Sequence, residues 1–215
     1  MKNKKPLVIV MVISLLTAII AYPFLPDQIP IHWDINGTAD QLGQKYYIFF
    51  PILMQILVIL GFSFFRKIDP RKSNYVRFSS AYSTLTLTIS LFIYAMELMT
   101  LLVVYQPTLL SVPALITIGL GILFIVLGNK MPQIKQNYFI GIKTPWALHD
   151  ENNWQKTHRF SGKLWFFIGF IFFPIAFLPT KIHAMILFFI VLLMALIPYL
   201  YSYLLYRKTS KGDSK

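Results

Sequence analysis

The chain has 215 residues, of which 56% are hydrophobic and 13% are charged, and its formal net charge is +12. A soluble globular domain typically has about 25% charged residues, so this composition argues against that class and favours an integral membrane protein. The chain has no cysteine, which excludes disulfides, thiol nucleophiles and thiolate metal ligands.

Six long apolar runs predict six transmembrane helices, because about 20 helical residues are needed to cross the hydrocarbon core. A backbone in lipid must satisfy its own hydrogen bonds, so each run should be helical and the expected fold class is all-α. The runs cover residues 7–25, 47–65, 81–105, 109–127, 164–178 and 182–206. The first run resembles a signal peptide, but it is long and has no clear cleavage site, so we expect an uncleaved helix.

The positions of the basic residues predict the orientation in the membrane. The N-terminus, the second loop, the fourth loop and the C-terminal tail hold 18 of the 20 Lys and Arg residues, and only Lys45 and Lys181 lie elsewhere. Lysine and arginine are retained on the cytoplasmic side of a membrane. We therefore expect both termini in the cytoplasm and residues 26–46 outside. Membrane topology is then the first explanation of the high positive charge, ahead of nucleic-acid binding.

The expected outer loop, residues 26–46, contains a turn signal and a few metal-ligand types. Asn36-Gly37 predicts a tight turn, since both residues tolerate positive φ. His32, Asp34 and Asp40 are possible ligand types, but they follow no metal-binding spacing. We therefore expect a compact turn with interfacial anchors and solvated acids, and no metal site.

The outer loop reads IPIHWDINGTAD and resembles a small membrane domain of unknown function that occurs in many bacterial proteins. The residues that carry this resemblance are Pro30, His32, Trp33, Asn36, Gly37 and Asp40. The resemblance implies an N-terminal two-helix domain over residues 1–77 and, after it, a four-helix domain over residues 78–215.

A long polar stretch separates the fourth and fifth apolar runs. Gly128-Asn129 should end the fourth helix, and Thr144-Pro145 should impose extended backbone before Trp146. Catalytic residues are not expected here, since the histidines and nearby Asp, Glu and Ser residues fit no triad order and the glycines do not form a phosphate loop.

The second half of this stretch predicts an amphipathic helix. Asp150 can cap it, with Glu151 in its first turn. One face of the helix would carry Trp154, His158, Ser161 and Trp165. We expect this helix to lie at the inner leaflet and lead into the fifth span. Its role is then either a structural anchor or an ordered platform that docks a soluble partner.

The stretch NYFIGIKTPWALHDENNWQKTHRFSGKLW resembles the signature of the SdpI-type immunity proteins. The matching residues are Asn129, Pro132, Asn137, Gly141, Thr144, Pro145, Trp146, Trp154, Thr157, His158, Gly162 and Trp165. Lys143 departs from the pattern, in which arginine is commoner, and a lysine cannot make bidentate contacts.

The resemblance implies a bacterial multi-pass membrane protein, surrounded by lipids, that protects its producer against a secreted peptide toxin on the outer side. It implies no enzyme activity, no cofactor and no direct nucleic-acid contact. In the family, immunity can be joined to signalling, in which the toxin-engaged protein holds a cytoplasmic autorepressor at the membrane.

Two alternatives remain open from the residues alone, a membrane enzyme and a small transporter or channel. A transport path would need polar groups in the spans, and these are few: Gln55, Ser83, Thr84, Thr86, Thr88, Ser90 and Glu97. Glu97 is the one acidic residue in a predicted span. It is either a neutral acid hydrogen-bonded across helices, or it lines a cavity reached from outside near Lys181 or His183.

Overall fold

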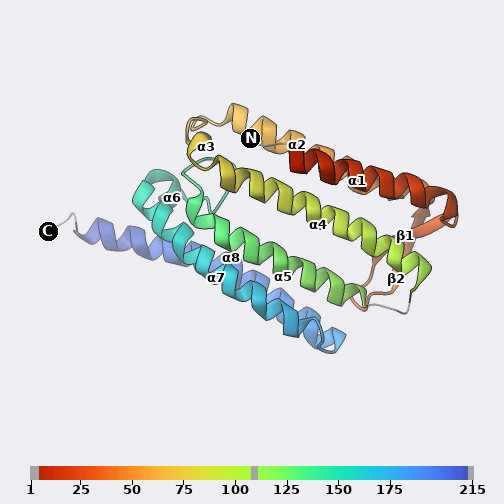
Figure 1. Ribbon diagram of the computed structural model, residues 1–215. Coiled ribbons are helices and arrows are strands. Elements are labelled where there is room, and N and C mark those ends of the chain that lie inside the picture. The colour runs from red at the N-terminus through yellow and green to blue at the C-terminus, as the bar shows by residue number, and fades with distance from the viewer. Residues whose placement is uncertain (1–4, 108–110, 213–215) are drawn as a thin grey trace.

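The described residues, 5–107 and 111–212 of a computed structural model, form a bundle of long helices with a small sheet at one end (Figure 1). The predicted fourth span begins at Leu109, which lies outside the described residues, as do Lys2, Lys4 and Lys215. The elements are α1 (Lys5–Ala21), η1 (Tyr22–Phe24), β1 (Gln28–Trp33), β2 (Ala39–Gln44), η2 (Lys45–Phe49), α2 (Phe50–Ile68), α3 (Asn74–Arg77), α4 (Ser79–Tyr105), α5 (Val112–Lys130), η3 (Met131–Gln133), α6 (Pro145–His149), α7 (Glu151–Ile175) and α8 (Thr180–Gly212).

In the described part of the chain, 5 helical segments are long and apolar enough to cross a membrane. These segments are Lys5–Phe24, Lys45–Ile68, Ser79–Tyr105, Val112–Gln133 and Lys181–Ser210. They agree with five of the six predicted spans and confirm the helical membrane class.

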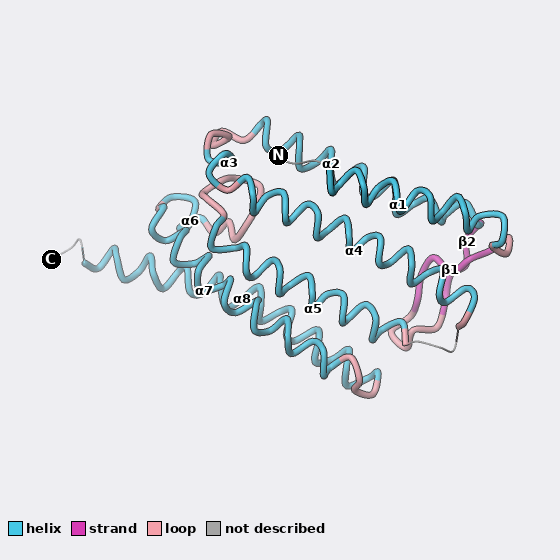
Figure 2. Tube along the Cα trace, in the orientation of Figure 1, coloured by secondary structure: helices cyan, strands magenta, loops and turns pink. Residues whose placement is uncertain are grey.

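The predicted fifth span, residues 164–178, belongs to α7, which also contains the predicted amphipathic helix. Charged residues in the first half of α7 lower its mean hydropathy, and α7 is not among the five apolar segments. We expected the amphipathic part to lie at the inner leaflet and to lead into the fifth span. Figure 2 shows one continuous helix that runs beside α5, so the amphipathic part does lead into the apolar part.

Two pairs of glycines bring α5 and α7 into close contact. A Cβ placed on Gly121 would lie 2.8 Å from the carbonyl oxygen of Gly169, and one on Gly128 would lie 2.6 Å from that of Gly162. Seven residues make about two helical turns, so the two glycines of each helix share a face. The helix ends at Lys130, one residue after the predicted Gly128-Asn129 stop, and Gly128 also allows the close packing on α7.

The expected outer loop forms a β-hairpin, which the all-α prediction did not include. Strands β1 and β2 are antiparallel, with Gln28 opposite Gln44 and Trp33 opposite Ala39. The turn is where Asn36-Gly37 predicted it, but only Gly37 has a positive φ, of 82°. The hairpin tip packs on the start of α5, because a Cβ on Gly37 would lie 2.5 Å from Cδ of Pro113.

Each end of the bundle has its own apolar core. At the hairpin end, the core side chains are Ala18, Leu25, Ile29, Ile48 and Ile52. At the opposite end, where the polar stretch between α5 and α7 folds, they are Tyr75, Phe78, Ala81, Tyr82, Leu85, Ile134, Ala147 and Trp154. We call this second region the motif end. The two cores hold both connecting regions against the helices.

Candidate functional site

Asn137 organises the loop between η3 and α6. Its Oδ1 accepts hydrogen bonds from the main-chain N–H groups of Phe139 (2.9 Å) and Ile140 (2.7 Å). Its Nδ2 donates to the carbonyl oxygens of Lys135 and Ile140, each at 2.9 Å. The Asn137 side chain is 0% exposed, so a buried amide uses both its oxygen and its nitrogen to fix the loop.

Thr144 begins α6, as the Thr144-Pro145 signal predicted. Thr144 is extended, with ψ of 153°, and its Oγ1 accepts from the N–H of Ala147 at 3.0 Å. The same oxygen lies 2.6 Å from Oγ of Ser202 on α8. Sequence reasoning did not identify Ser202, because nothing in its neighbourhood indicates a partner 58 residues away.

Asp150 caps α7, which confirms the sequence prediction. Its carboxylate accepts from the N–H groups of Asn152 (2.9 Å) and Asn153 (3.0 Å). The Asn153 side chain then reaches α8, where its Oδ1 accepts from Oγ of Ser202 at 2.7 Å. Thr157 also donates to Asn153, at 3.1 Å. The start of α7 is thus locked to α8 through buried polar groups.

The tryptophan face of α7 packs against neighbouring elements inside the protein. Trp154 is 0% exposed, and its Nε1 donates to the carbonyl oxygen of Ile134 at 2.9 Å. Trp165 is half-buried, and its Nε1 donates to the carbonyl oxygen of Met194 on α8 at 3.1 Å. The interfacial-anchor interpretation is therefore wrong for Trp154, which is a core residue.

His158 stacks on Trp154, with ring centroids 4.0 Å apart, and joins α7 to the loop. Its Nε2 accepts from the N–H of Ile142 at 3.1 Å, so Nδ1 carries the proton and donates to the carbonyl oxygen of Trp154 at 2.8 Å. Burial lowers the pKa of His158 to about 4, although the Trp154 carbonyl opposes this shift. The neutral ring is a structural link and offers no free base.

Asp69, which sequence reasoning missed, connects the loop after α2 to the motif end. It is 1% exposed and accepts from the N–H of Arg71 at 2.7 Å, the hydroxyl of Tyr75 at 2.8 Å and the N–H of Tyr138 at 3.0 Å. Burial and the hydrogen bond to Asp69 raise the pKa of Tyr75. An Asp-Pro pair signals a turn, but the sequence does not indicate this distant partner.

Two further bonds complete the connection. Nη2 of Arg71 donates to the carbonyl oxygen of Leu148 at 3.1 Å, and Nδ2 of Asn74 donates to that of Gln136 at 2.8 Å. The segment around α3 and the stretch before α7 therefore form one hydrogen-bonded unit.

The remaining motif residues lie at the surface, except for Gly162. Asn129, Pro132 and Pro145 are exposed. Gly162 is buried at the α5–α7 crossing. Trp146 is half-buried against three aromatic rings of α8, those of Tyr199, Tyr203 and Tyr206.

Beside Trp146, α6 and the end of α8 border a cavity of about 590 Å³. The cavity is lined by Pro145, Trp146, His149, Asp150, Asn153, Tyr206, Thr209 and Ser210. Lys143, the departure from the family pattern, is exposed and makes a single hydrogen bond from Nζ to the carbonyl oxygen of Phe139 at 3.3 Å.

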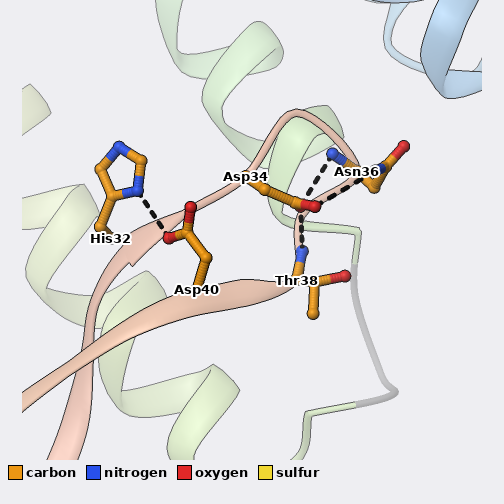
Figure 3. A network of polar contacts seen from close by, with 5 residues as sticks. All are labelled: His32, Asp34, Asn36, Thr38 and Asp40. Carbon is orange, nitrogen blue, oxygen red and sulfur yellow. Dashed lines mark hydrogen bonds and ion pairs between the residues drawn. The ribbon is translucent and has the colours of Figure 1, made fainter.

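At the other end of the bundle, the hairpin side chains pair across the strands (Figure 3). Nδ1 of His32 lies 2.6 Å from Oδ1 of Asp40, but both are well exposed, so this pair contributes little to stability. Asp34 accepts from the N–H groups of Asn36 (2.9 Å) and Thr38 (2.8 Å), and these bonds lower the pKa of Asp34. Its carboxylate therefore stabilises the turn.

The side chains of His32, Asp34 and Asp40 are used in these local contacts. Within residues 5–107 and 111–212, no group of three His, Cys, Asp or Glu residues is placed to hold a metal ion. Pro30 and Trp33 are half-buried on β1, and Asn36 is exposed at the turn.

Glu97 lies inside the bundle, with the carboxyl group 0% exposed. Its Oε2 accepts a hydrogen bond from Oγ of Ser14, which in turn accepts from Nε2 of Gln55 at 3.0 Å. His183 does not lie beside it but 2.7 Å from Oγ1 of Thr117. Among the described residues, the hydrogen bond of Glu97 is therefore made to α1, and His183 is engaged with α5.

Several other polar residues of α4 hydrogen-bond to their own helix, whereas Oγ of Ser90 is buried without a hydrogen-bond partner among the described residues. Ser83, Thr84, Thr86 and Thr88 each donate to the carbonyl oxygen four residues earlier. Such bonds satisfy the hydroxyl groups locally and give a transport path no support from these residues.

Comparisons with known proteins agree with both resemblances seen in the sequence. Residues 133–202 match the model of the SdpI/YfhL protein family, and residues 9–56 match that of a domain of unknown function. The chain is 32% identical over 210 residues to the protein named immunity protein SdpI of Bacillus subtilis (strain 168), covering 97% of this chain and 98% of that protein. No solved structure matches the chain. Together with the apolar helices, this similarity shows a multi-pass cell-membrane protein that belongs to the SdpI/YfhL family.

Proposed function

We propose that this protein is an immunity protein that protects a bacterium against a secreted peptide toxin, without catalysis and without a cofactor. The observation that carries the proposal is the similarity to immunity protein SdpI, which extends over 97% of this chain and 98% of that protein. Because the match includes both ends of the bundle, it relates the whole architecture of the two proteins and not one shared segment.

The proposed topology has six spans, with residues 164–178, which include the second half of α7, as the fifth, and places both termini and the motif end in the cytoplasm. It divides the chain into a two-helix unit over residues 1–77 and a four-helix unit over residues 78–215. The supporting observations are the 18 basic residues of the inward segments and the course of α7 beside α5 (Figure 1). The hairpin would then face outside, where a secreted toxin arrives.

The motif end would serve as a platform for a cytoplasmic repressor. In support, its loop is held by Asn137, His158 and Asp69, so the surface that it presents is ordered. Exposed basic side chains of α7, such as Lys156 and Arg159, are available to steer an acidic partner surface.

Survival of a toxin-sensitive bacterium that expresses only this protein tests the immunity function. Expression should raise the toxin concentration needed to kill, and the empty vector provides the baseline. The proposal fails if the folded, membrane-inserted protein gives no protection against any secreted peptide toxin that is encoded next to its gene.

Recruitment of a repressor needs a separate measurement, which is co-sedimentation of the candidate repressor with membranes. Replacing Lys156 with Gln should weaken recruitment in a salt-dependent way, because exposed charges are screened by salt. Trp154→Ala is unsuitable for this purpose, since removing a fully buried Trp costs about 3–5 kcal/mol and lowers protein abundance.

A further inference from the structure

A small polar cluster lies inside the bundle, among the first three long helices. Ser14 on α1, Gln55 on α2 and Glu97 on α4 form this cluster, and each side chain is 0% exposed. Helices α1, α2 and α4 pack against one another, as Figure 1 shows. A carboxyl group is thus enclosed by three apolar helices.

The hydrogen bonds of the cluster run in one direction and leave two acceptors unused. Nε2 of Gln55 donates to Oγ of Ser14 at 3.0 Å, and the Ser14 hydroxyl donates to Oε2 of Glu97. Among the described residues, Oε1 of Glu97 and Oε1 of Gln55 are buried without a hydrogen-bond partner. Two buried oxygens of the cluster therefore lack a hydrogen-bond donor.

The three helices bring no cation near the carboxyl group. Lys5 is nine residues before Ser14, and the basic residues nearest to Gln55 along the chain are Lys45 and Arg66, ten and eleven residues away. At 1.5 Å per residue these separations are roughly 14–17 Å along a helix. In the described part of the chain, no ion pair to Glu97 is present.

Other titratable groups on the packed elements are also engaged or distant. On α4, the hydroxyl of Tyr94 lies 3.1 Å from Oγ1 of Thr17, its hydrogen-bond partner. On α5, Lys130 lies in the last turn of the helix at the motif end. On β1, His32 is exposed on the hairpin.

An unpaired carboxylate in such surroundings costs several kcal/mol, whereas a neutral acid supplies the missing donor. We propose that Glu97 is held as the neutral acid, and that Ser14, Gln55 and Glu97 form an intramembrane proton-binding site. In this site the proton is on Oε1 of Glu97, the carboxyl oxygen that accepts no hydrogen bond from the described residues. The same proton removes the charge that would otherwise oppose packing of α1 and α2 on α4.

Infrared spectroscopy of the full chain in lipid at neutral pH tests the proposal directly, since a neutral acid and a carboxylate have different carbonyl bands. We expect the wild type to show a carboxylic-acid C=O band that is absent from Glu97→Gln. Ser14→Ala should move this band to higher frequency, because a hydrogen bond to the carbonyl oxygen is lost. This second variant also assigns the band if the Gln variant does not fold.

Glu151→Gln is the matched control, because Glu151 is exposed on α7 and should be ionised in water. This variant should lose carboxylate intensity and keep the acid band. The proposal is overturned if the wild type has no acid band and Glu97→Gln loses a carboxylate band instead. It is equally overturned if the band disappears when potassium chloride is replaced by sodium chloride, since the site would then bind a sodium ion.

Discussion

Gly141 lies directly against the imidazole ring of His158. A Cβ built on Gly141 would be 2.3 Å from Nε2 of His158, and Gly141 has a φ of +105°. Both the space and the backbone conformation therefore require glycine at this position. The contact lets the N–H of the next residue, Ile142, reach Nε2 and tie the loop to α7.

Replacing Gly141 with Ala should destabilise the motif end. The left-handed conformation alone costs an L-residue about 1–2 kcal/mol, and the clash with the ring adds to that. We expect a lower thermal unfolding midpoint in detergent and reduced protein abundance in the membrane.

Gly61→Ala is the control for Gly141→Ala, because a Cβ on Gly61 in α2 would meet only the Phe65 ring at 3.8 Å. In a helix, alanine is favoured over glycine by about 1 kcal/mol, so this variant should be neutral or more stable. Equal unfolding midpoints for the two variants would contradict the role assigned to Gly141.

His158 should make stability depend on pH between about 6.5 and 4. Its pKa is lowered from 6.5 to about 4 in the fold, so over this interval the unfolded chain binds a proton that the folded chain does not. The contribution of His158 to the free energy of unfolding is therefore fully present above about pH 6.5 and is lost as the pH falls toward 4. A shift of this size corresponds to at most about 3 kcal/mol.

The measurement for His158 is the unfolding midpoint as a function of pH, compared between the wild type and His158→Gln. Glutamine can both donate and accept hydrogen bonds but does not titrate in this range. The variant should lose this part of the pH dependence, and parallel curves for the two proteins would show that another group is responsible.

Asp69→Asn should destabilise the connection between the α2–α3 loop and the motif end. The Asp69 carboxylate accepts three hydrogen bonds. In asparagine an NH2 group replaces one of the two oxygens, and at least one of the three buried donors would then face another donor. Leaving a buried donor unsatisfied costs about 1–3 kcal/mol.

Asp27→Asn tests whether loss of any aspartate charge has the same effect. Oδ1 of Asp27 lies 3.2 Å from Nζ of Lys45, but the Asp27 side chain is 91% exposed, so its loss should be nearly neutral. Unfolding midpoints in detergent compare the two variants. If Asp69→Asn is as stable as Asp27→Asn, the connection through Asp69 does not matter for stability.

Local signals explain which parts of the fold could be predicted. Five of the six apolar runs, the extended backbone at Thr144-Pro145 and the Asp150 cap depend on residues that are neighbours in the chain, and these predictions are confirmed. The hairpin was missed because β2 has no alternation of apolar and polar residues, although Ile29, Ile31 and Trp33 alternate with other residues along β1. The seven-residue spacing of Gly121 and Gly128 could have indicated a close helix contact.

Distant partners could not be predicted, because they depend on how each helix is rotated in the bundle. In the sequence, nothing distinguishes Ser202, Asn153 and Asp69 from other polar residues. Only the structure shows their contacts with the motif end. Periodicity correctly grouped Trp154 and His158 on one face, but it could not distinguish a face toward lipid from a face toward protein.

The topology can be tested with single cysteines, since the chain has none of its own. Cysteine at Asn36 should react with an impermeant thiol reagent on intact cells, and cysteine at Ser210 should react only after the membrane is opened. Both positions are exposed, whereas Gly37 is unsuitable because its φ is positive and Pro113 is adjacent. Labelling at Ser210 on intact cells would contradict a cytoplasmic C-terminus.

Glu97→Gln should preserve expression but weaken protection against the toxin. Glutamine has nearly the same shape, and its oxygen can still accept from Ser14, so packing of α1 on α4 should be retained. A glutamine side chain cannot release or take up a proton, and protection will therefore fall if immunity requires exchange of the Glu97 proton. Toxin survival and immunoblotted abundance are measured together, with Ser14→Ala as a variant that loses a hydrogen bond but keeps the acid. Full protection by Glu97→Gln at normal abundance would limit Glu97 to a packing role.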